Sequence, residues 1–368
     1  MSISPFLSPT GHSRNRRALS ARRRRRRRLV AFAVVVLAAA AVLVDETGLA
    51  GGSGERPHQA SHTAATKRGA HRASATAVGA RSPSGLPLAR PALALAGISK
   101  PPQQDPVQVN FAHPPRAGLL FNLTTGQVLW QHNALVRMPI ASLTKLMTAL
   151  LAVQSAPANA RVLITKQAVN MPGSKVGVLP LGKHVPLESL LYGLLLPSGN
   201  DAAVALAQHV AGSVSKFVTL MNQEAAKLGL GCTRYSSPSG YYNANNYSCA
   251  ADLAVLAHVD MAQPRIAKVV GTYEAILPFP IKGGKLYLYN NNPLLIYKYP
   301  GVTGMKTGQT EAAGRCVVAT AERHGVRLGA IVLDSEDPGT QDRQLLDLGF
   351  ERVYHQPIVP EQPFPPGV

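Results

Sequence analysis

Three short motifs carry side chains that together can transfer an acyl group. They are Ser-Leu-Thr-Lys at Ser142–Lys145, Ser-Gly-Asn at Ser198–Asn200 and Lys-Thr-Gly at Lys306–Gly308. A serine hydroxyl attacks an acyl carbon well only when a base takes its proton, and a lysine with a lowered pKa can be that base. The order of the motifs therefore predicts a serine nucleophile that uses lysine, rather than histidine, as its base.

The spacing of the first motif suits this chemistry if Ser142 opens a helix. The segment Ser142–Val153 has the apolar pattern of a helix, and residues three apart on a helix have Cβ atoms about 5–6 Å apart. Lys145 is thus expected within reach of the Ser142 hydroxyl. Its pKa, about 10.4 in the reference state, must fall through burial or a second cation, for which Lys306 is the candidate. Taken alone, the motif fits a helix cap with a solvated lysine better than a catalytic pair.

The Ser-Gly-Asn motif lies between two expected helices, Leu187–Leu196 and Asp201–Val210, and should form a tight loop. From this loop Ser198 is expected to relay a proton to a leaving amine. Asn200 is expected to hold either Lys145 or an amide of the substrate. Taken alone, the tripeptide fits a simple connection between helices better.

The Lys-Thr-Gly motif lies in a glycine-rich segment, Gly301–Gly308, that fits a strand. In a strand Lys306 and Gly308 share a face, and a glycine there lets a substrate backbone lie against the strand edge. Lys306 and Thr307 are then expected to bind a carboxylate. The alternative is a glycine-rich turn with an exposed lysine.

The elements that must position these motifs predict an α+β fold. Apolar runs predict strands at 117–123 and 127–131, joined by a turn at 124–126, and two buried strands at 315–321 and 327–333. Helices are expected at 142–153, 187–196, 201–210, 216–228 and 341–350, and a turn-rich loop at 235–246 has Tyr and Asn side chains that suit a cleft. Strands at both ends with helices between them predict one antiparallel sheet flanked by helices, plus a helical cluster.

The motifs together resemble the serine D-alanyl-D-alanine carboxypeptidases, low-molecular-mass penicillin-binding proteins related to class A β-lactamases. The similarity runs from about Ala117 to Phe350 and extends beyond the motifs, through 139–149, 194–203 and 301–310. It also includes the helix over 221–229 that runs into Pro-Ser-Gly at 238–240. The resemblance implies a β-lactamase/transpeptidase-like fold.

The resemblance also implies a reaction and four catalytic residues. Ser142 would be the nucleophile that forms the acyl-enzyme, and Lys145 its proton acceptor. Ser198 and Asn200 would complete the proton network. The implied reaction removes the terminal D-alanine from a peptidoglycan stem pentapeptide, after which water releases the shortened peptide. β-Lactams would acylate the same serine, and neither a cofactor nor a metal is implied.

Substrate binding is assigned by the same resemblance to the strand that carries Lys-Thr-Gly. Lys306 and Thr307 would bind the terminal carboxylate, with Gly308 beside the substrate backbone. The backbone N–H groups of Ser142 and Gln309 would form the oxyanion hole, and such donors contribute about 2.7–4 kcal/mol each in comparable sites.

One departure from the family concerns this carboxylate. Some members place an arginine in the loop that follows the strand corresponding to 327–333. This chain has Asp-Ser-Glu-Asp at Asp334–Asp337 instead. We therefore expect Lys306 to bind the carboxylate with less help.

Other functions fit parts of the chain. A D-alanyl endopeptidase that cuts crosslinks needs the same residues and remains open. A β-lactamase-like hydrolase needs a glutamate to activate the deacylating water, and the nearby Glu188 and Glu224 stand in unsuitable contexts. A catalytically silent protein that binds β-lactams or the cell wall is disfavoured because all proposed catalytic residues are present.

Most of the positive charge lies in an N-terminal leader. Residues 1–100 hold 17 Lys and Arg against 3 Asp and Glu, which is +14 of the chain's net +19. An arginine run at Arg22–Arg28 precedes an apolar run of 16 residues at Leu29–Val44, about 24 Å of helix at 1.5 Å per residue. This pattern predicts a secretion signal or a membrane anchor rather than nucleic-acid binding. We favour an anchor because no small-x-small cleavage site directly follows the run.

The leader predicts the domain organisation and the location. Residues 1–28 should stay in the cytoplasm, 29–44 form the signal or transmembrane segment, and 45–105 a disordered tether rich in Ala, Gly, Ser and Pro. The catalytic domain should span 106–355, before a Pro-rich tail at 356–368. It should lie at the outer face of the cytoplasmic membrane or in the cell wall. A membrane-tethered basic adaptor would explain residues 1–100 but none of the later motifs.

Three cysteines, Cys232, Cys249 and Cys316, leave the redox state open. In an exported protein Cys232 and Cys249 are the expected pair because both lie in a loop-rich stretch. Three unpaired, partly buried cysteines fit the sequence equally well. No Cys-x-x-Cys or His/Cys cluster indicates a metal site.

Overall fold

The computed structural model describes residues 80–241 and 245–358. The predicted basic segment 1–28 and apolar segment 29–44 lie outside this part of the chain, as does most of the predicted tail. Among the described residues, no helix combines the length and the apolar character needed to cross a membrane.

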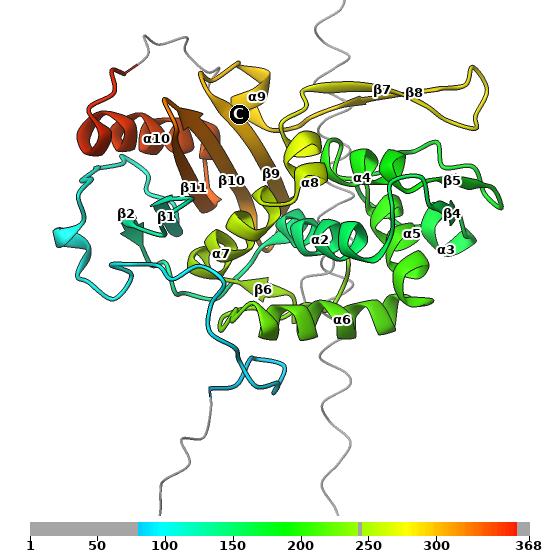
Figure 1. The fold of residues 1–368 in the computed structure, drawn as a ribbon, viewed down its shortest axis with the longest axis horizontal. Helices are drawn as coiled ribbons and strands as arrows, with labels where there is room; N and C mark the ends of the chain where they lie inside the picture. Colours follow the sequence, from blue (N-terminus) through cyan, green and yellow to red (C-terminus); the bar gives the residue numbers. More distant parts are fainter. Residues whose placement is uncertain (1–79, 242–244, 359–368) are drawn as a thin grey trace, which may run out of the picture. The chain divides into compact units, whose positions relative to one another are not determined.

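A five-stranded antiparallel sheet brings the two ends of the described chain together (Figure 1). Its strands are β1 (Ala117–Asn122), β2 (Val128–His132), β9 (Val302–Thr310), β10 (Gly314–Arg323) and β11 (Val326–Ser335), in the order β2-β1-β11-β10-β9. Early strand β1 pairs with late strand β11, so that Ala117 lies opposite Leu333. The predicted antiparallel sheet is confirmed, and the strand that carries Lys-Thr-Gly forms its edge.

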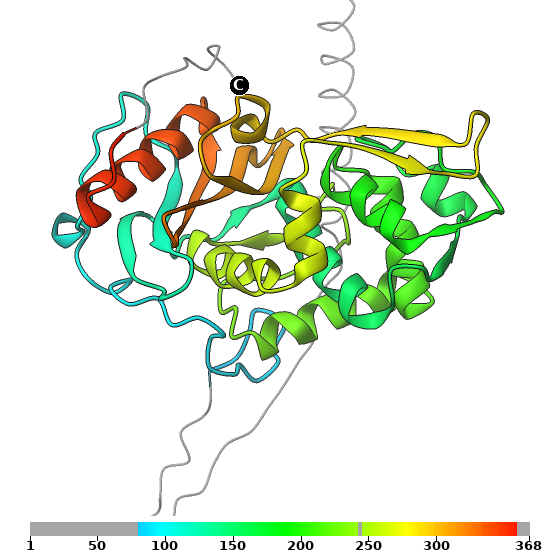
Figure 2. The same cartoon turned by 45° about the horizontal axis from the view of Figure 1, so that its top comes forward.

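Helices cover both faces of the sheet (Figure 2). On one face, α10 (Pro338–Tyr354) packs Leu345, Leu346 and Phe350 against Val317 and other side chains of the sheet. On the other face lie α2 (Lys145–Ser155), α7 (Ala250–Met261) and α8 (Pro264–Val270), packed against Val318 and its neighbours. Adjacent residues of β10 thus enter different cores, which explains why this strand reads as a continuous apolar run.

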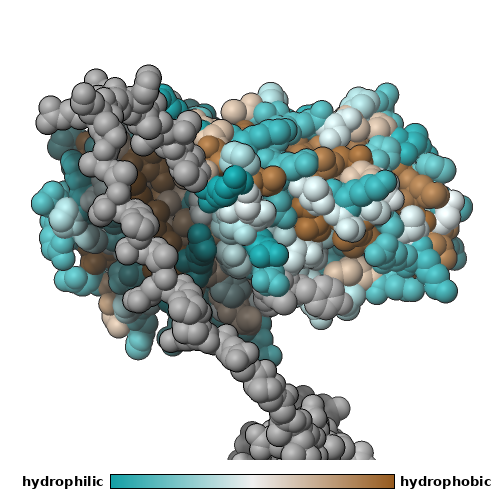
Figure 3. All heavy atoms as spheres, turned by 90° about the horizontal axis from the view of Figure 1, so that it is seen from below, coloured by the Kyte–Doolittle hydropathy of each residue, from teal (hydrophilic) through white to brown (hydrophobic). Residues whose placement is uncertain are grey.

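A helical cluster adjoins the sheet on the side of β9. It contains α3 (Lys166–Val169), α4 (Leu187–Leu195), α5 (Asn200–Ala211) and α6 (Val214–Lys227). Two two-stranded antiparallel sheets adjoin it. One pairs β4 (Arg161–Leu163) with β5 (His184–Pro186), and the other pairs β7 (Glu274–Pro278) with β8 (Lys285–Tyr289). The short elements are η1 (Pro102–Gln104), β3 (Met138–Pro139), η2 (Ala141–Thr144), β6 (Tyr247–Ser248) and α9 (Pro293–Ile296). On the face shown in Figure 3, hydrophilic and hydrophobic residues are interspersed.

The tether predicted over 45–105 is wrong from residue 80 onward. Ala89 N donates to Ala226 O at 3.0 Å and Ala92 N donates to Leu228 O at 3.2 Å, so this segment runs along the end of α6. Leu93 is buried in the main core. The composition of the segment is that of a linker, but Leu93, the partly buried Leu95 and Ile98, and main-chain hydrogen bonds hold it against the surface of the domain. Residues 45–79 lie outside the described chain.

The predicted helix over 142–153 begins later than expected. Ser142 lies in the 3₁₀ turn η2, and the α-helix starts at Lys145. The turn is tightened by the Thr144 hydroxyl, which donates to Ala141 O at 2.7 Å. Gly240 packs against the same turn, where a Cβ atom would collide with Ala141 O. This contact between distant segments, rather than local helix propensity, determines the conformation of the first motif.

The expected disulfide is confirmed, since Cys232 and Cys249 are bonded to each other and Cys316 is a buried free thiol. The disulfide fixes the start of α7 to the preceding loop. Asp252 lies close to both sulfur atoms and gives the described residues a cluster of potential metal ligands. The two sulfurs are committed to the disulfide, however, and Asp252 accepts hydrogen bonds from Cys232 N and the Thr233 hydroxyl.

Candidate active site

The first motif brings a buried amine to a serine hydroxyl. Lys145 Nζ lies 2.8 Å from Ser142 Oγ, as the three-residue spacing predicted. The same nitrogen donates to Asn200 Oδ1 at 2.7 Å and to Ser239 O at 2.9 Å. Lys145 is completely buried at the start of α2. Its amine is therefore held against Ser142 by oxygens from two other segments of the chain.

Burial also changes the proton affinity of this amine. Loss of solvation lowers the pKa of Lys145 well below its usual value, and the nearby Lys306 lowers this pKa further. Asp201 acts in the opposite direction. Lys306 is itself buried, and burial lowers its pKa to about 7. A lysine in these surroundings can lose its proton near neutral pH and then accept the proton of a neighbouring hydroxyl.

The Ser-Gly-Asn motif forms the tight loop that the sequence predicted between α4 and α5. Gly199 N donates to Gly193 O at 2.9 Å, and Asn200 N donates to Ser174 O at 2.8 Å. The Asn200 side chain donates to Pro172 O at 2.8 Å, which orients its carbonyl oxygen toward Lys145. Of the two predicted partners of Asn200, the structure thus shows the lysine.

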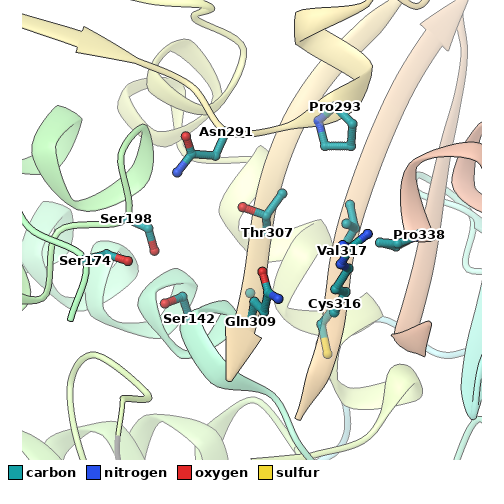
Figure 4. A pocket seen from close by; sticks show the side chains of 12 residues that line it. Ser142, Ser174, Ser198, Asn291, Pro293, Thr307, Gln309, Cys316, Val317 and Pro338 are labelled. Carbon is teal, nitrogen blue, oxygen red and sulfur yellow. The ribbon is translucent and has the colours of Figure 1, made fainter. Parts of the chain in front are cut away.

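Ser198 has an unusual position in this loop. Its backbone is in the left-handed region, with φ of 66°. Its hydroxyl is buried and finds no hydrogen-bond partner among the described residues. Ser142 and Ser198 border the same cavity, and their hydroxyl groups lie on the same side of it (Figure 4). A buried hydroxyl without a partner is costly, and a bound substrate can supply that partner.

The edge strand β9 lies directly against the turn η2 at Ser142. A Cβ atom on Gly308 would lie 3.1 Å from Ser142 N and 2.9 Å from Ile140 O, so only glycine fits without displacement of η2. This contact explains the glycine of the third motif. It places Thr307 and Gln309, the neighbours of Gly308 on β9, beside Ser142 (Figure 4). The oxyanion hole expected from Ser142 N and Gln309 N stays a prediction.

These elements enclose a cavity of about 440 Å³. Its lining comes from η2, the loops that carry Ser174 and Ser198, the start of α9 with the residues before it, β9, β10 and the start of α10. The lining residues are Ser142, Ser174, Ser198, Asn291, Pro293, Thr307, Gly308, Gln309, Arg315, Cys316, Val317 and Pro338. Lys145, Asn200 and Lys306 are buried behind this lining. Lys306 Nζ donates to Thr307 O at 2.8 Å. The structure therefore gathers all eight predicted site residues in one place, with the two lysines beneath the surface.

Sequence reasoning missed several parts of the site. Ser239 contributes only its carbonyl oxygen, and a main-chain acceptor leaves no mark in a sequence. Its segment, Pro-Ser-Gly at 238–240, was noted for its family likeness but received no role. Asp201 was read only as the start of a helix, yet its carboxylate accepts from Val176 N at 2.9 Å and Gly177 N at 3.1 Å, which fixes the loop that carries Ser174. Arg315 was placed on a strand without a function.

The chain is similar to known proteins in sequence and in fold. Residues 105–337 match the family described as D-alanyl-D-alanine carboxypeptidase. The chain is 34% identical over 256 residues to the D-alanyl-D-alanine carboxypeptidase DacF of Bacillus subtilis, a match that covers 67% of this chain and 65% of that protein. It is 37% identical over 217 residues to DacB2 of Mycobacterium tuberculosis, covering 58% of this chain and 73% of DacB2. The matched region thus spans just under two thirds of the Bacillus relative.

Among solved structures, the Streptomyces K15 DD-transpeptidase is similar throughout its length. The two share 32% sequence identity with a TM-score of 0.62, over 66% of this chain and 99% of the transpeptidase. A penicillin-binding protein homologue from Mycobacterium tuberculosis has a TM-score of 0.63 at 31% identity, over 73% of this chain and 99% of the homologue. These likenesses confirm the transpeptidase-like fold expected from the sequence.

Proposed function

Because the chain belongs to the D-alanyl-D-alanine carboxypeptidase family of serine peptidases, we propose that it removes the terminal D-alanine from peptidoglycan stem peptides through an acyl-enzyme on Ser142. One observation carries this proposal. A buried Lys145 amine, with its pKa lowered, lies 2.8 Å from the Ser142 hydroxyl at the wall of a cavity.

The proposed acylation step follows from these contacts. Ser142 Oγ bonds to the carbonyl carbon between the two D-alanine residues, and the neutral amine of Lys145 takes the hydroxyl proton. The carbonyl oxygen becomes an oxyanion, which the N–H groups of Ser142 and Gln309 stabilise. When the peptide bond breaks, the proton held by Lys145 passes by way of Ser198 to the amine of the departing D-alanine, which leaves the Lys145 amine neutral again. This assignment gives the unpaired Ser198 hydroxyl its partner.

Deacylation reverses the roles of the same groups. Water replaces the departed D-alanine, and Lys145 takes a proton from it as it attacks the ester carbon. The bond between Ser142 Oγ and that carbon then breaks, and the serine recovers its proton. Asn200 keeps the lysine amine in position through both steps by its 2.7 Å hydrogen bond. β-Lactams would acylate the same serine.

The experiment that tests the proposal measures D-alanine release. The full-length chain is incubated with a diacyl-L-Lys-D-Ala-D-Ala peptide and with its L-Ala-L-Ala counterpart as a control. We expect release from the first peptide only, together with covalent labelling by a fluorescent penicillin. Labelling without release would favour a β-lactam-binding protein. Cleavage of a crosslinked dimer in preference to the linear peptide would favour the endopeptidase.

We also propose that the catalytic domain acts outside the cytoplasm. The arginine run and the apolar run at the N-terminus support export, and the disulfide between Cys232 and Cys249 is typical of an oxidising compartment. If residues 29–44 are not cleaved off, we propose that they anchor the chain in the cytoplasmic membrane. Mass spectrometry of the mature N-terminus distinguishes a cleaved signal from a retained anchor.

Lys306 should control the pH at which Lys145 becomes a base. Replacing Lys306 by methionine removes a cation that disfavours protonated Lys145, so the pKa of Lys145 should rise. The acid limb of the acylation rate should then move to higher pH by about one unit. The measurement is the first-order acylation rate at saturating penicillin from about pH 5 to about pH 9, the range in which lowered lysine pKa values fall.

The control for this experiment is Lys183→Met, which removes an exposed lysine. Saturating penicillin separates the pH effect from any weaker binding of the carboxylate. An acid limb that stays in place in Lys306→Met would show that Lys306 does not influence the base.

A further inference from the structure

The loop between the two bonded cysteines holds the amine of Lys145. Ser239 O accepts from Lys145 Nζ at 2.9 Å, and Pro238 O accepts from the Thr148 hydroxyl at 2.7 Å. Both acceptors are main-chain oxygens, so their positions depend on the course of the loop rather than on a side chain. Lys145 and Thr148 are three residues apart at the start of α2. The loop thus fixes the first turn of this helix at two points.

The same loop orders the turn that carries Ser142. Asn246 Nδ2 donates to the Thr144 hydroxyl at 2.8 Å, and that hydroxyl in turn donates to Ala141 O at 2.7 Å. Gly240 packs so closely on this turn that a Cβ atom would collide with Ala141 O. The loop therefore contacts both the turn of the nucleophile and the helix of the base.

A disulfide closes this loop at a position where a helix usually has another residue. Cys249 is the N-cap of α7, and its side chain makes no capping hydrogen bond. Ser, Thr, Asp and Asn are preferred at an N-cap because their side-chain oxygen accepts from a free N–H group of the first turn. The Cys249 sulfur is bonded to Cys232 instead. The residue at the start of α7 thus serves the crosslink rather than the helix.

Polar contacts close the loop next to the disulfide. Arg234 and Tyr247 exchange two main-chain hydrogen bonds of 2.9 Å, and the hydroxyl oxygens of Thr233 and Ser248 lie 2.8 Å apart. Water can replace each of these hydrogen bonds when the loop opens. A crosslink restricts the opened chain as well as the closed one. The loop should therefore separate from α2 more often once the disulfide is reduced.

We propose that the Cys232–Cys249 disulfide positions Lys145 and makes the active site sensitive to reduction. The inference rests on the proposed acyl-enzyme at Ser142. Cys232 is half-buried and Cys249 is fully buried, so attack from solvent begins at the Cys232 sulfur. The oxidised chain is the active form, which suits a domain that acts in an oxidising compartment.

The reduction is a thiol–disulfide exchange with a dithiol. One sulfur of the dithiol bonds to the Cys232 sulfur, the S–S bond breaks, and Cys249 leaves and takes up a proton. The second sulfur of the dithiol then closes a disulfide within the reductant and releases Cys232 as a thiol. Two electrons and two protons thus pass from the reductant to the two cysteines.

Reduction should change the proton affinity of Lys145 as well as its position. Burial is the main cause of the lowered pKa of Lys145, Lys306 on β9 lowers this pKa further, and Asp201 on α5 raises it. Both charged neighbours lie outside the loop. A loop that withdraws Ser239 O admits water and removes part of the effect of burial. Loss of that hydrogen bond acts in the opposite direction, but burial is the larger cause, so the pKa of Lys145 should rise.

The test compares the oxidised full-length chain with the same chain after treatment with dithiothreitol, which is removed before mixing. The first-order acylation rate at saturating penicillin is measured from about pH 5 to about pH 9. Reduction should move the acid limb to higher pH by about one unit, which slows acylation about tenfold at pH values below the limb. A merely structural disulfide would lower the active fraction equally at every pH. Reoxidation should restore the original profile.

A double variant removes the crosslink without a reductant. The chain with Cys232→Ala and Cys249→Ser should show the pH profile of the reduced chain and should no longer respond to dithiothreitol. The serine can cap α7, so the variant tests the crosslink rather than the start of the helix. A response of this variant to dithiothreitol would show that the reductant acts elsewhere.

Two outcomes would overturn the proposal. One is an acid limb that stays in place although mass spectrometry after alkylation shows complete reduction. The other is a reduced chain without a cooperative thermal transition, because the disulfide would then stabilise the whole fold instead of positioning one residue. The proposed function fails separately, if the oxidised chain is acylated by penicillin but releases no D-alanine from the peptide.

Discussion

Replacing Ser142 by alanine should abolish covalent labelling by a fluorescent penicillin and lower D-alanine release by at least about 10⁴-fold. The reason is that no acyl-enzyme can form without Ser142 Oγ, whereas Lys145, Asn200 and the cavity remain in place. The fold should be unaffected, because the side chain lies at a cavity wall and its loss removes only the hydrogen bond to Lys145. Gel fluorescence and intact-protein mass spectrometry measure the labelling.

The control for this variant is Ser215→Ala, which removes an exposed hydroxyl from α6. It should label as the wild-type chain does. Labelling that persists in Ser142→Ala would show that another nucleophile is acylated, and peptide mapping of the adduct would then identify it.

The second large effect is expected for Lys145→Met. A positioned general base contributes about 10²- to 10⁴-fold, so acylation by penicillin should slow by a factor in this range. Methionine fills the space of a buried lysine without a charged group to desolvate. Asn200 Oδ1 and Ser239 O each lose a donor, and leaving an acceptor unsatisfied costs about 1–3 kcal/mol. The two effects on stability oppose each other, and the folded state should persist.

Stopped-flow acylation rates and a thermal melt of Lys145→Met check this expectation together. Lys183→Met again serves as the control, because it removes an exposed lysine that does not line the cavity. Acylation at the wild-type rate in Lys145→Met would exclude this lysine as the base and direct attention to Lys306.

Much of the fold could be predicted because its elements have simple local patterns. Strands β10 and β11 are buried on both faces and read as apolar runs, and α4, α5 and α6 were expected within a few residues of their observed bounds. Helix α7 was not predicted, since it is buried nearly all around and has no polar face to reveal a period. The hairpin of β7 and β8 was also missed. Its outer face exposes the large apolar side chains Ile276, Tyr287 and Tyr289. The two strands therefore lack the alternation of apolar and polar residues that indicates a half-buried strand.

In the candidate site, too, local features could be predicted from the sequence and long-range contacts could not. The distance from Ser142 to Lys145 is local, and a three-residue spacing was enough to predict it. The hydrogen bonds from Lys145 to Asn200 and Ser239 join segments 55 and 94 residues away, and only the packing of α2, α5 and the loop before β6 creates them. Arg315 was invisible for a similar reason. Its place in the cavity lining depends on the pairing of β10 with β9, in which Arg315 lies opposite Gln309.

By itself, the sequence determined which groups are available for catalysis, namely a serine, two lysines and an asparagine in three motifs, and the family to which they point. The tertiary structure alone decided their proton affinities and their surroundings. Desolvation of Lys145 depends on every segment that excludes water from its amine, and the second cation that lowers its pKa comes from a strand 161 residues further along the chain. A pattern of residue types holds no information about burial of this kind, because burial is a property of the packed chain.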